Sequence, residues 1–309
     1  MATIHNITST FTGKNAANYL RAALLTNKTM TQNAVDIRDN IQFKEVIQLI
    51  TSDANLIKPA SCDFNATGEL TTTEVVLEPT EFQVNLTVCT KNFRSSWESL
   101  QMRGVKAGLP RTFGEFILEH VVQKTAAAVE SAIWTNSTSS TDIPFNGWEA
   151  LAAADSTVID VSASSVTADT VTTELGKVVD AIPSAVYSKD DLFIFVPTAI
   201  YQKYIRALGG FGASGKGAAG LDNQGNTWYN GQDLFFDGIK LIHAPGMTSS
   251  KMMAGLKSNF IVGSSLFSEN AEASIIDMSS IDGSQNARVI LRGSLGVQIG
   301  IGAETVLYS

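Results

Sequence analysis

The chain has 309 residues, 44% of them hydrophobic and 17% charged, with a formal net charge of −8. Its charged fraction lies below the roughly 25% of ordinary soluble domains, and Ser, Thr and Asn take up the difference. Two cysteines, Cys62 and Cys89, exclude a disulfide scaffold and a multi-cysteine zinc site. A polar, weakly charged surface fits a chain that is largely covered by other chains. It fits a secreted β-rich protein equally well, so composition leaves both classes open.

The sequence shows neither a secretion signal nor a run of apolar residues that would span a membrane. The first residues, MATIHNITSTFTGKN, contain no apolar core of signal-peptide length. No apolar run approaches the roughly 20 residues that span a bilayer. The two cysteines could pair, but a reducing compartment is the simpler interpretation.

Charge is distributed unevenly along the chain. Residues 1–35 contain three basic residues and no acid, and residues 59–90 contain five acids and no Lys or Arg. Residues 91–111 reverse the sign, with five basic residues against Glu98. Such runs are often solvated faces, and complementary contact surfaces are the alternative interpretation.

The N-terminal third predicts one short helix followed by strands. Residues 14–28 show the apolar spacing of a short amphipathic helix. EVIQLI at 45–50 and ELTTTEVVLEP at 69–79 flank a turn-rich segment, which predicts a long two-stranded hairpin. Such a hairpin has no core of its own and must lie against something else. FQVNLTV at 82–88 alternates as a half-buried strand does.

Helices are concentrated in the middle of the chain. Residues 112–135 predict a long helix with a capping box of Thr112 and Glu115. Further helices are expected at 168–182, ended by Pro183, and at 198–208, with the buried strand LFIFV between them. The expected apolar face of the long helix comprises Phe113, Ile117, Val121, Ala128, Ala132 and Ile133.

The glycine-rich stretch GFGASGKG at 210–217 falls one residue short of a nucleotide-binding phosphate loop. Gly217 replaces the hydroxyl residue that would hold magnesium. The stretch also follows a helix and runs into a turn-rich segment, whereas a phosphate loop follows a strand and opens a helix. We therefore interpret it as a mobile loop.

The C-terminal third predicts strands joined by tight turns. Asp237-Gly238 and Asp282-Gly283 each stand between strand-like runs. GVQIGIGAETVLY closes the chain, and this last segment is expected to return to the sheet that begins near Val84. The fold class is therefore α+β.

No catalytic constellation is present in the sequence. The histidines His5, His120 and His243 stand apart, and no metal-ligand or nucleophile motif accompanies them. We expect no enzyme activity, no cofactor and no metal site.

The order of elements resembles the major capsid proteins of tailed bacteriophages of the Hong Kong 97 type. TFGEFILEHVVQKTAAAVESAIWTN resembles the spine helix of that family, and YSKDDLFIFVPTAIYQKYIRAL resembles its axial strand–helix pair. DGIKLIHAPGMTSSKMMAGLKSNFIVG and RVILRGSLGVQIGIGAETVLY resemble its return and closing strands. The resemblance covers the whole chain and rests on arrangement.

The resemblance implies a division of the chain into five regions. Residues 1–36 would form an N-terminal arm, 37–76 the extended E-loop hairpin, and 77–146 a peripheral domain with the spine helix. Residues 147–245 would form the axial domain, and residues 246–309 would return strands to the peripheral domain.

The function that the resemblance implies is shell building. Copies of the chain would form hexamers and pentamers in an icosahedral head around phage double-stranded DNA, assembled in the cytoplasm of the bacterial host and retained in the virion. Other implied partners are a portal vertex, a decoration protein and the DNA itself, bound without sequence preference; no membrane is implied. Because about 36 residues precede the hairpin, we expect a separate scaffolding protein, or none, in place of a self-cleaved N-terminal segment.

Two sets of residues are candidate sites under this reading. Glu69, Glu74 and Glu78 of one subunit would face basic residues of its neighbour, namely Arg94, Arg103 and Lys106. Glycines at the head of the glycine-rich stretch would line the capsomer axis: Gly209, Gly210, Gly212 and Gly215. Two alternatives stand beside the phage capsid: an encapsulin-like cellular nanocompartment shell, and a secreted β-rich surface protein.

Overall fold

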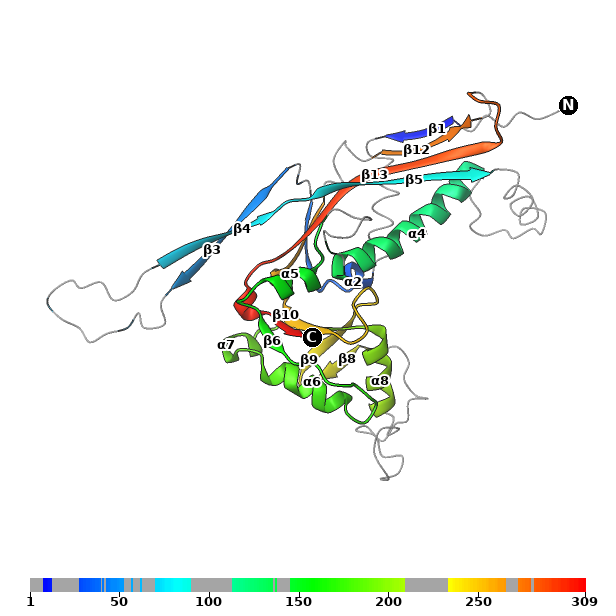
Figure 1. Cartoon of the computed structure of the whole chain (residues 1–309). Helices are drawn as coiled ribbons and strands as arrows, with labels where there is room; N and C mark the ends of the chain where they lie inside the picture. The colour runs from blue at the N-terminus through cyan, green and yellow to red at the C-terminus, as the bar shows by residue number, and fades with distance from the viewer. Residues whose placement is uncertain are drawn as a thin grey trace.

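The structure is a computed structural model with two packed bodies and one projecting hairpin (Figure 1). A long sheet with one long helix against it forms the first body, and a second sheet covered by shorter helices forms the other. The structure describes residues 8–12, 28–39, 41, 43–52, 57, 62, 70–89, 113–135, 137, 145–208, 233–264, 272–278 and 281–309.

The first sheet is organised around one long strand, β13 (Asn286–Ile299). Its first half pairs on one side with β12 (Glu272–Asp277), which β1 (Thr8–Thr12) extends, and its second half pairs with β11 (Phe260–Ser264). β2 (Asp36–Asp39) adds in parallel to β11, and β5 (Thr80–Cys89) pairs with β13 over ten residues. β13 therefore ties together segments from both ends of the chain.

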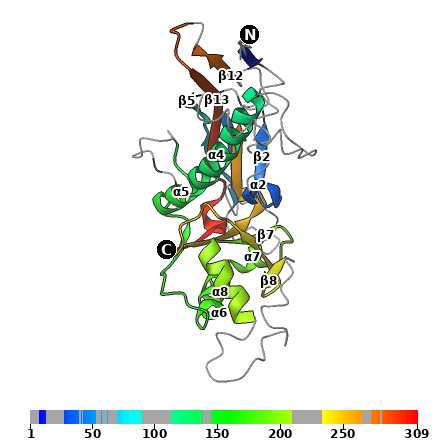
Figure 2. The same ribbon diagram turned by 90° about the vertical axis from the view of Figure 1, so that its right-hand side faces the viewer.

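Helix α4 (Phe113–Thr135) lies against one face of this sheet, and the short α2 (Lys28–Thr31) lies beside it (Figures 1 and 2). Ala287, Val289 and Leu291 of β13 alternate into the core that this helix shares. Val121, Ala132 and Ile133 are buried as predicted, but Ala128 is exposed. The expectation for Ala128 was wrong because the buried face of the helix is centred near Val122 and Val129, and Ala128 lies outside it.

The second sheet has the order β6–β14–β10–β7–β9–β8. Helices α6 (Val171–Asp180) and α8 (Thr198–Leu208) pack against one face of this sheet. The short helix α7 (Ser184–Tyr187) lies at its edge. Its strands are β6 (Ile159–Val161), β7 (Leu192–Val196), β8 (Leu234–Phe236), β9 (Ile239–His243), β10 (Met252–Leu256) and β14 (Val306–Tyr308).

Aromatic side chains join the two bodies into one core. Trp134 of α4 meets Trp148 of α5 (Trp148–Ala154) edge-on, with ring centroids 4.8 Å apart. Phe195 of β7 meets Phe260 of β11 at 4.7 Å in the same way. Such edge-to-face pairs fix geometry beyond the area that they bury.

Sheet membership corrects one expectation. The closing segment, residues 296–308, was expected to return to the sheet that begins near Val84. Its first part does so, since Val297 pairs with Val262 of β11 in the first sheet, but the final strand β14 pairs with β10 and β6 within the second sheet. The 3₁₀ turns η2 (Lys257–Asn259) and η4 (Gly302–Glu304) carry the chain across between the bodies. The five-region division itself stays a prediction.

Several local predictions are confirmed. Asp237 and Gly238 form the turn between β8 and β9, with φ angles of 48° and 81° that the tight hairpin turn requires. The five apolar positions predicted for the helix at 168–182 are all buried: Val171, Leu175, Val178, Val179 and Ile182. The helix predicted at 14–28 and the glycine-rich stretch lie outside the described residues, apart from Lys28, where α2 begins. Of the capping box, Glu115 belongs to the described α4 but Thr112 lies outside the described residues, so the box stays a prediction.

Candidate functional site: the projecting hairpin and its root

The hairpin consists of β3 (Glu45–Ser52) and β4 (Leu70–Leu77). The strands pair antiparallel from Glu45 opposite Leu77 to Ser52 opposite Leu70, and they form a two-stranded sheet of their own. Figure 1 shows this sheet pointing away from both bodies. The predicted hairpin is thus confirmed. Because an isolated two-stranded hairpin is marginal in water, its outer part has little to stabilise it within the described subunit.

One face of the hairpin carries a set of aliphatic side chains that we call the aliphatic strip. It consists of Val46 and Ile50 of β3 with Leu70 and Val76 of β4, which the register places on the same face. These side chains are 50%, 72%, 69% and 41% exposed, respectively. Phe43 and Ile57 add two further exposed apolar side chains close to the hairpin in sequence. Apolar surface gathered in this way is a candidate for contact with another molecule.

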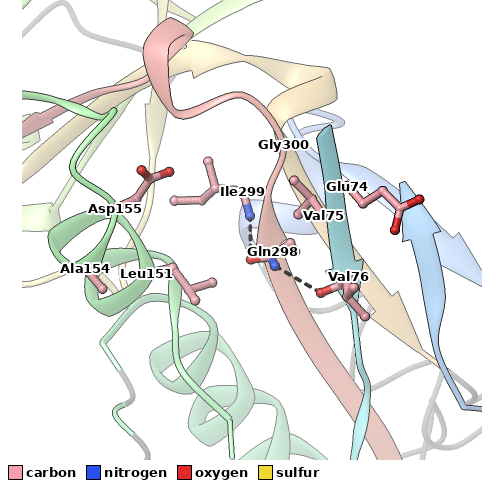
Figure 3. A pocket seen from close by; sticks show the side chains of 9 residues that line it. All are labelled: Glu74, Val75, Val76, Leu151, Ala154, Asp155, Gln298, Ile299 and Gly300. Atoms are coloured by element: carbon pink, nitrogen blue, oxygen red, sulfur yellow. Dashed lines mark hydrogen bonds between the residues drawn. The ribbon is translucent and has the colours of Figure 1, made fainter. Parts of the chain in front are cut away.

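Glu74 stands within the aliphatic strip. It lies opposite Gln48, whose Nε2 donates to the Glu74 carboxylate over 3.5 Å, at the limit for a hydrogen bond. In Figure 3 the carboxylate points away from the hairpin root and from β13. The strip therefore combines an apolar surface with one negative charge.

Leu77 fixes the root of the hairpin. Its side chain is fully buried with Ile41 and Ile261 in a small core of their own. Gly263 of β11 makes room for it, since a Cβ there would lie 2.8 Å from Leu77 Cδ2. A Cβ on Gly296 of β13 would lie 2.9 Å from the Cα of Pro79, just beyond the hairpin. Two glycines thus allow the root to pack directly against the first sheet.

Ion pairs surround the same root. Lys44 Nζ lies 2.9 Å from Glu78, and Arg38 of β2 contacts both Glu45 and Asp36, the latter at 3.2 Å. Partial burial acts to lower the pKa of Arg38, but hydrogen bonds to Glu45 and Asp36 outweigh it and raise that pKa. All these side chains keep about a third or more of their exposure, so each pair adds at most about 1 kcal/mol. These ion pairs therefore help to set the direction of the hairpin more than they stabilise the subunit.

A groove of about 400 Å³ lies beside the root, between β4, α5 and the end of β13 (Figure 3). Gln298 closes its floor: the side-chain Nε2 donates to the backbone oxygen of Val76 over 3.0 Å, and Oε1 accepts from the N–H of Ile299. Asp155 at the rim accepts from the backbone and hydroxyl of Thr157, which is a turn contact. The groove is lined by Glu74, Val75, Val76, Leu151, Ala154, Asp155, Gln298, Ile299 and Gly300.

The predicted site residues are only partly described. Glu74 and Glu78 both lie on or next to β4, but Glu78 pairs with Lys44 of its own chain. The other predicted residues lie outside the described part: Glu69, Arg94, Arg103, Lys106, Gly209, Gly210, Gly212 and Gly215. Whether the acidic and basic sets meet is therefore untested. The aliphatic strip was not predicted, although apolar residues in a hairpin without a core were a signal for it.

No described side chains form a catalytic arrangement. His120 is exposed on α4, and Nε2 of His243 shares a 2.8 Å hydrogen bond with the Thr198 hydroxyl while its ring stacks on Tyr201. His5 lies outside the described residues. Both cysteines have free thiols. Over the described ranges, no group of three or more His, Cys, Asp or Glu residues could hold a metal ion, and no helix is long and apolar enough to cross a membrane.

A buried network anchors the end of the chain instead. The Tyr308 hydroxyl donates to Glu174 over 2.7 Å, and Lys177 Nζ lies 2.9 Å from the same carboxylate. Burial acts to raise the pKa of Glu174, but the hydrogen bonds from Lys177 and Tyr308 outweigh it and lower that pKa. Burial, reinforced by the Glu174 carboxylate, raises the pKa of Tyr308. This network holds β14 against α6 and is structural.

Comparison with solved structures identifies the fold. A capsid subunit of the native GTA particle superposes with a TM-score of 0.59 at 10% identity, over 100% of this chain and 94% of the other. A subunit of the satellite phage P4 procapsid gives 0.56 at 9% identity, over 94% and 98%. A virus-like particle from Pyrococcus furiosus gives 0.54 at 10% identity, again over 94% and 98%.

The chain has the capsid fold of the Hong Kong 97 type. No protein-family model matches the sequence, and no curated protein matches it significantly. At identities of 9–10%, these capsid subunits share the fold of this chain but few of its residues. Among the described residues of this fold, the projecting hairpin exposes Val46, Ile50, Leu70 and Val76 on one face.

Proposed function

We propose that this protein is a major capsid protein, whose copies assemble as hexamers and pentamers into the icosahedral head of a tailed phage around double-stranded DNA. The observation that carries the proposal is the hairpin, a β ribbon with an exposed aliphatic strip and no core. The capsid fold, matched over nearly the full length of both chains, supports it.

The hairpin is the proposed contact between neighbouring copies. Its strip would lie on the next subunit, where each aliphatic side chain gains up to about 1.5–3 kcal/mol if it becomes fully buried. Association consumes part of that gain, because it orders side chains and removes the freedom of two separate bodies. The packed root supplies direction, since Leu77 and the ion pairs hold the base of the hairpin against the first sheet.

Charge would set the registry of this contact. We keep the proposal that Glu69 and Glu74 of one copy face Arg94, Arg103 and Lys106 of the next, with Glu78 contributing less because Lys44 already pairs with it. Each exposed pair is worth at most about 1 kcal/mol. Such pairs select orientation and partner more than they add affinity.

The remaining partners belong to the same proposal. The glycine-rich stretch would line the capsomer axis, where one sequence must fit rings of two sizes. A portal vertex, a separate scaffolding protein and a decoration protein are proposed partners, and the packaged DNA would be bound without sequence preference. The subunit would be made in the cytoplasm of the bacterial host and retained in the virion.

A nanocompartment shell is the second candidate. The virus-like particle from Pyrococcus furiosus has the same fold, so the fold alone does not separate a phage head from another kind of shell. The contents do, because a head holds DNA and a nanocompartment holds protein cargo. The third interpretation, a secreted β-rich surface protein, does not account for the 23-residue helix α4 or for the capsid fold.

Electron microscopy of the purified recombinant protein tests the proposal. Closed particles or rings are the expected result, for the protein alone or together with a scaffolding protein. Particles recovered from an infected host should contain nuclease-protected DNA; particles that contain only a protein cargo would favour the nanocompartment. A compact monomer at high concentration under all these conditions would contradict shell building.

A further inference from the structure

The described subunit does not explain why an acid stands at position 74. Glu74 lies on β4 between Leu70 and Val76, in the middle of the aliphatic strip. Its described contact is the long hydrogen bond from Gln48. Neither burial nor an ion pair in the described part of the chain calls for a carboxylate at this place.

Two free hairpins have surfaces that match each other. A patch can pair with its own copy around a two-fold axis, as in most homodimers, and the strip presents four exposed aliphatic side chains for that purpose. Its strand edges add to the hazard, because in the described part of the chain β3 and β4 pair only with each other. Exposed strand edges pair readily with other chains. Free subunits therefore face off-pathway pairing through their hairpins.

We propose that Glu74 is a specificity-determining residue that keeps free hairpins from pairing with each other and admits only a surface that brings a cation. In a two-fold pair both Glu74 carboxylates enter the same small apolar contact. Neither strand of the hairpin supplies a cation to compensate them, because β3 and β4 contain no Lys or Arg. Lys44 is held by Glu78 at the root, and Lys58 belongs to the segment beyond the paired strands. A buried charge without a partner disfavours the contact strongly.

A partner surface with a basic side chain would remove this penalty. Only the identity of that partner rests on the proposed function, in which the neighbouring copy brings the basic residues between 91 and 111. Exclusion of a second hairpin is a property of the free subunit. It can be measured whether or not shells form.

Sedimentation velocity on purified subunits, below the concentration at which particles appear, tests the inference. Glu74→Gln keeps the shape and removes the charge, so the dissociation constant of a subunit dimer should fall by at least about tenfold relative to the unmodified chain. Glu74→Lys places like charges in the contact again and should stay monomeric. Glu81→Gln is the matched control, because Glu81 is an exposed acid on β5, outside the strip. It should leave the subunit monomeric.

The double variant Glu74→Gln/Ile50→Ser should return to the monomer, which locates the new contact on the strip. A monomeric Glu74→Gln subunit would overturn the inference, as would an equal dimer of Glu81→Gln or a dimer that survives Ile50→Ser. Shell formation by the unmodified chain is scored separately by electron microscopy. A chain that never forms shells would defeat the proposed function and leave the dimer measurement to judge Glu74.

Discussion

Gly296 of β13 packs against the backbone at Pro79, where the hairpin joins β5. A Cβ at position 296 would lie 2.9 Å from the Cα of Pro79 and 2.9 Å from the backbone oxygen of Glu78. Backbone atoms cannot swing aside as the end of a flexible side chain can. The direction in which the hairpin leaves the body therefore depends on the absence of a side chain at this position.

Gly296→Ala should move the hairpin root or destabilise the subunit. Overpacking at a tight buried site costs about 1–3 kcal/mol, and a shift at the root is amplified along the hairpin. We expect a lower melting temperature, faster amide hydrogen exchange near Leu77, and fewer closed particles. Unchanged exchange and normal particles would show that the hairpin angle is set elsewhere.

Gly176→Ala is the matched control and a prediction in its own right. Gly176 lies inside helix α6, and a Cβ there would meet no atom within 4 Å. Alanine in a helix interior is about 0.5–1 kcal/mol more favourable than glycine. The melting temperature should rise by about 1–3 °C, with particle formation unaffected. A loss of stability would mean that the glycine is needed for a reason that the subunit does not show.

Leu77→Ala and Ile50→Ala should separate folding from assembly. Leu77 is fully buried at the root, so its truncation should cost about 2–5 kcal/mol of unfolding free energy. Ile50 is 72% exposed, so its truncation should change that free energy by no more than about 0.5 kcal/mol. Particle yield should nevertheless fall for Ile50→Ala. Chemical denaturation and electron microscopy on the same samples measure both quantities, and normal assembly of Ile50→Ala would remove the strip from the interface.

Glu174 predicts how stability depends on pH. Its pKa is lower in the folded chain than in the unfolded chain, so the unfolded state binds the proton more readily. The stabilisation is therefore present above the unfolded pKa, near 4.3, and is lost as pH falls through the folded value. Glu174→Gln should be about 1–3 kcal/mol less stable at pH 7, and the difference should shrink towards pH 3. A constant difference across that range would show that the carboxylate charge is not responsible.

Much of the local structure could be predicted because it depends on local composition and short-range periodicity. EVIQLI and ELTTTEVVLEP are rich in strand-forming residues and flank a turn-rich segment, and they form the two strands of the hairpin. The five apolar residues from Val171 to Ile182 follow the period of a helix, and all of them are buried. Asp-Gly is a dipeptide typical of tight hairpin turns, and Asp237 and Gly238 adopt the positive φ angles of such a turn.

The sheet that the final strand joins could not be predicted in the same way. Val306, Leu307 and Tyr308 read as a buried strand, and a buried strand is apolar whichever sheet it joins. What places β14 in the second sheet is its pairing with β10 and β6, more than fifty residues distant in sequence, together with the Tyr308–Glu174 hydrogen bond. Such long-range partners leave no periodic trace.

The hairpin could be predicted as a structural element, but the set of residues on its exposed face could not. The sequence indicated a hairpin without a core, but Glu69, Glu74 and Glu78 were grouped by charge alone. The structure separates them by position: Glu78 pairs with Lys44 at the root, whereas Glu74 lies within the aliphatic strip. Register, which decides which residues share a face, follows from the pairing of β3 with β4.

The most direct test is a cryo-electron microscopy reconstruction of assembled particles that resolves the path of residues 45–77. The account predicts that this hairpin crosses onto a neighbouring copy, with Val46, Ile50, Leu70 and Val76 covered and a basic side chain within reach of Glu74. A hairpin folded back on its own subunit, or a strip that faces solvent in the closed particle, would contradict it.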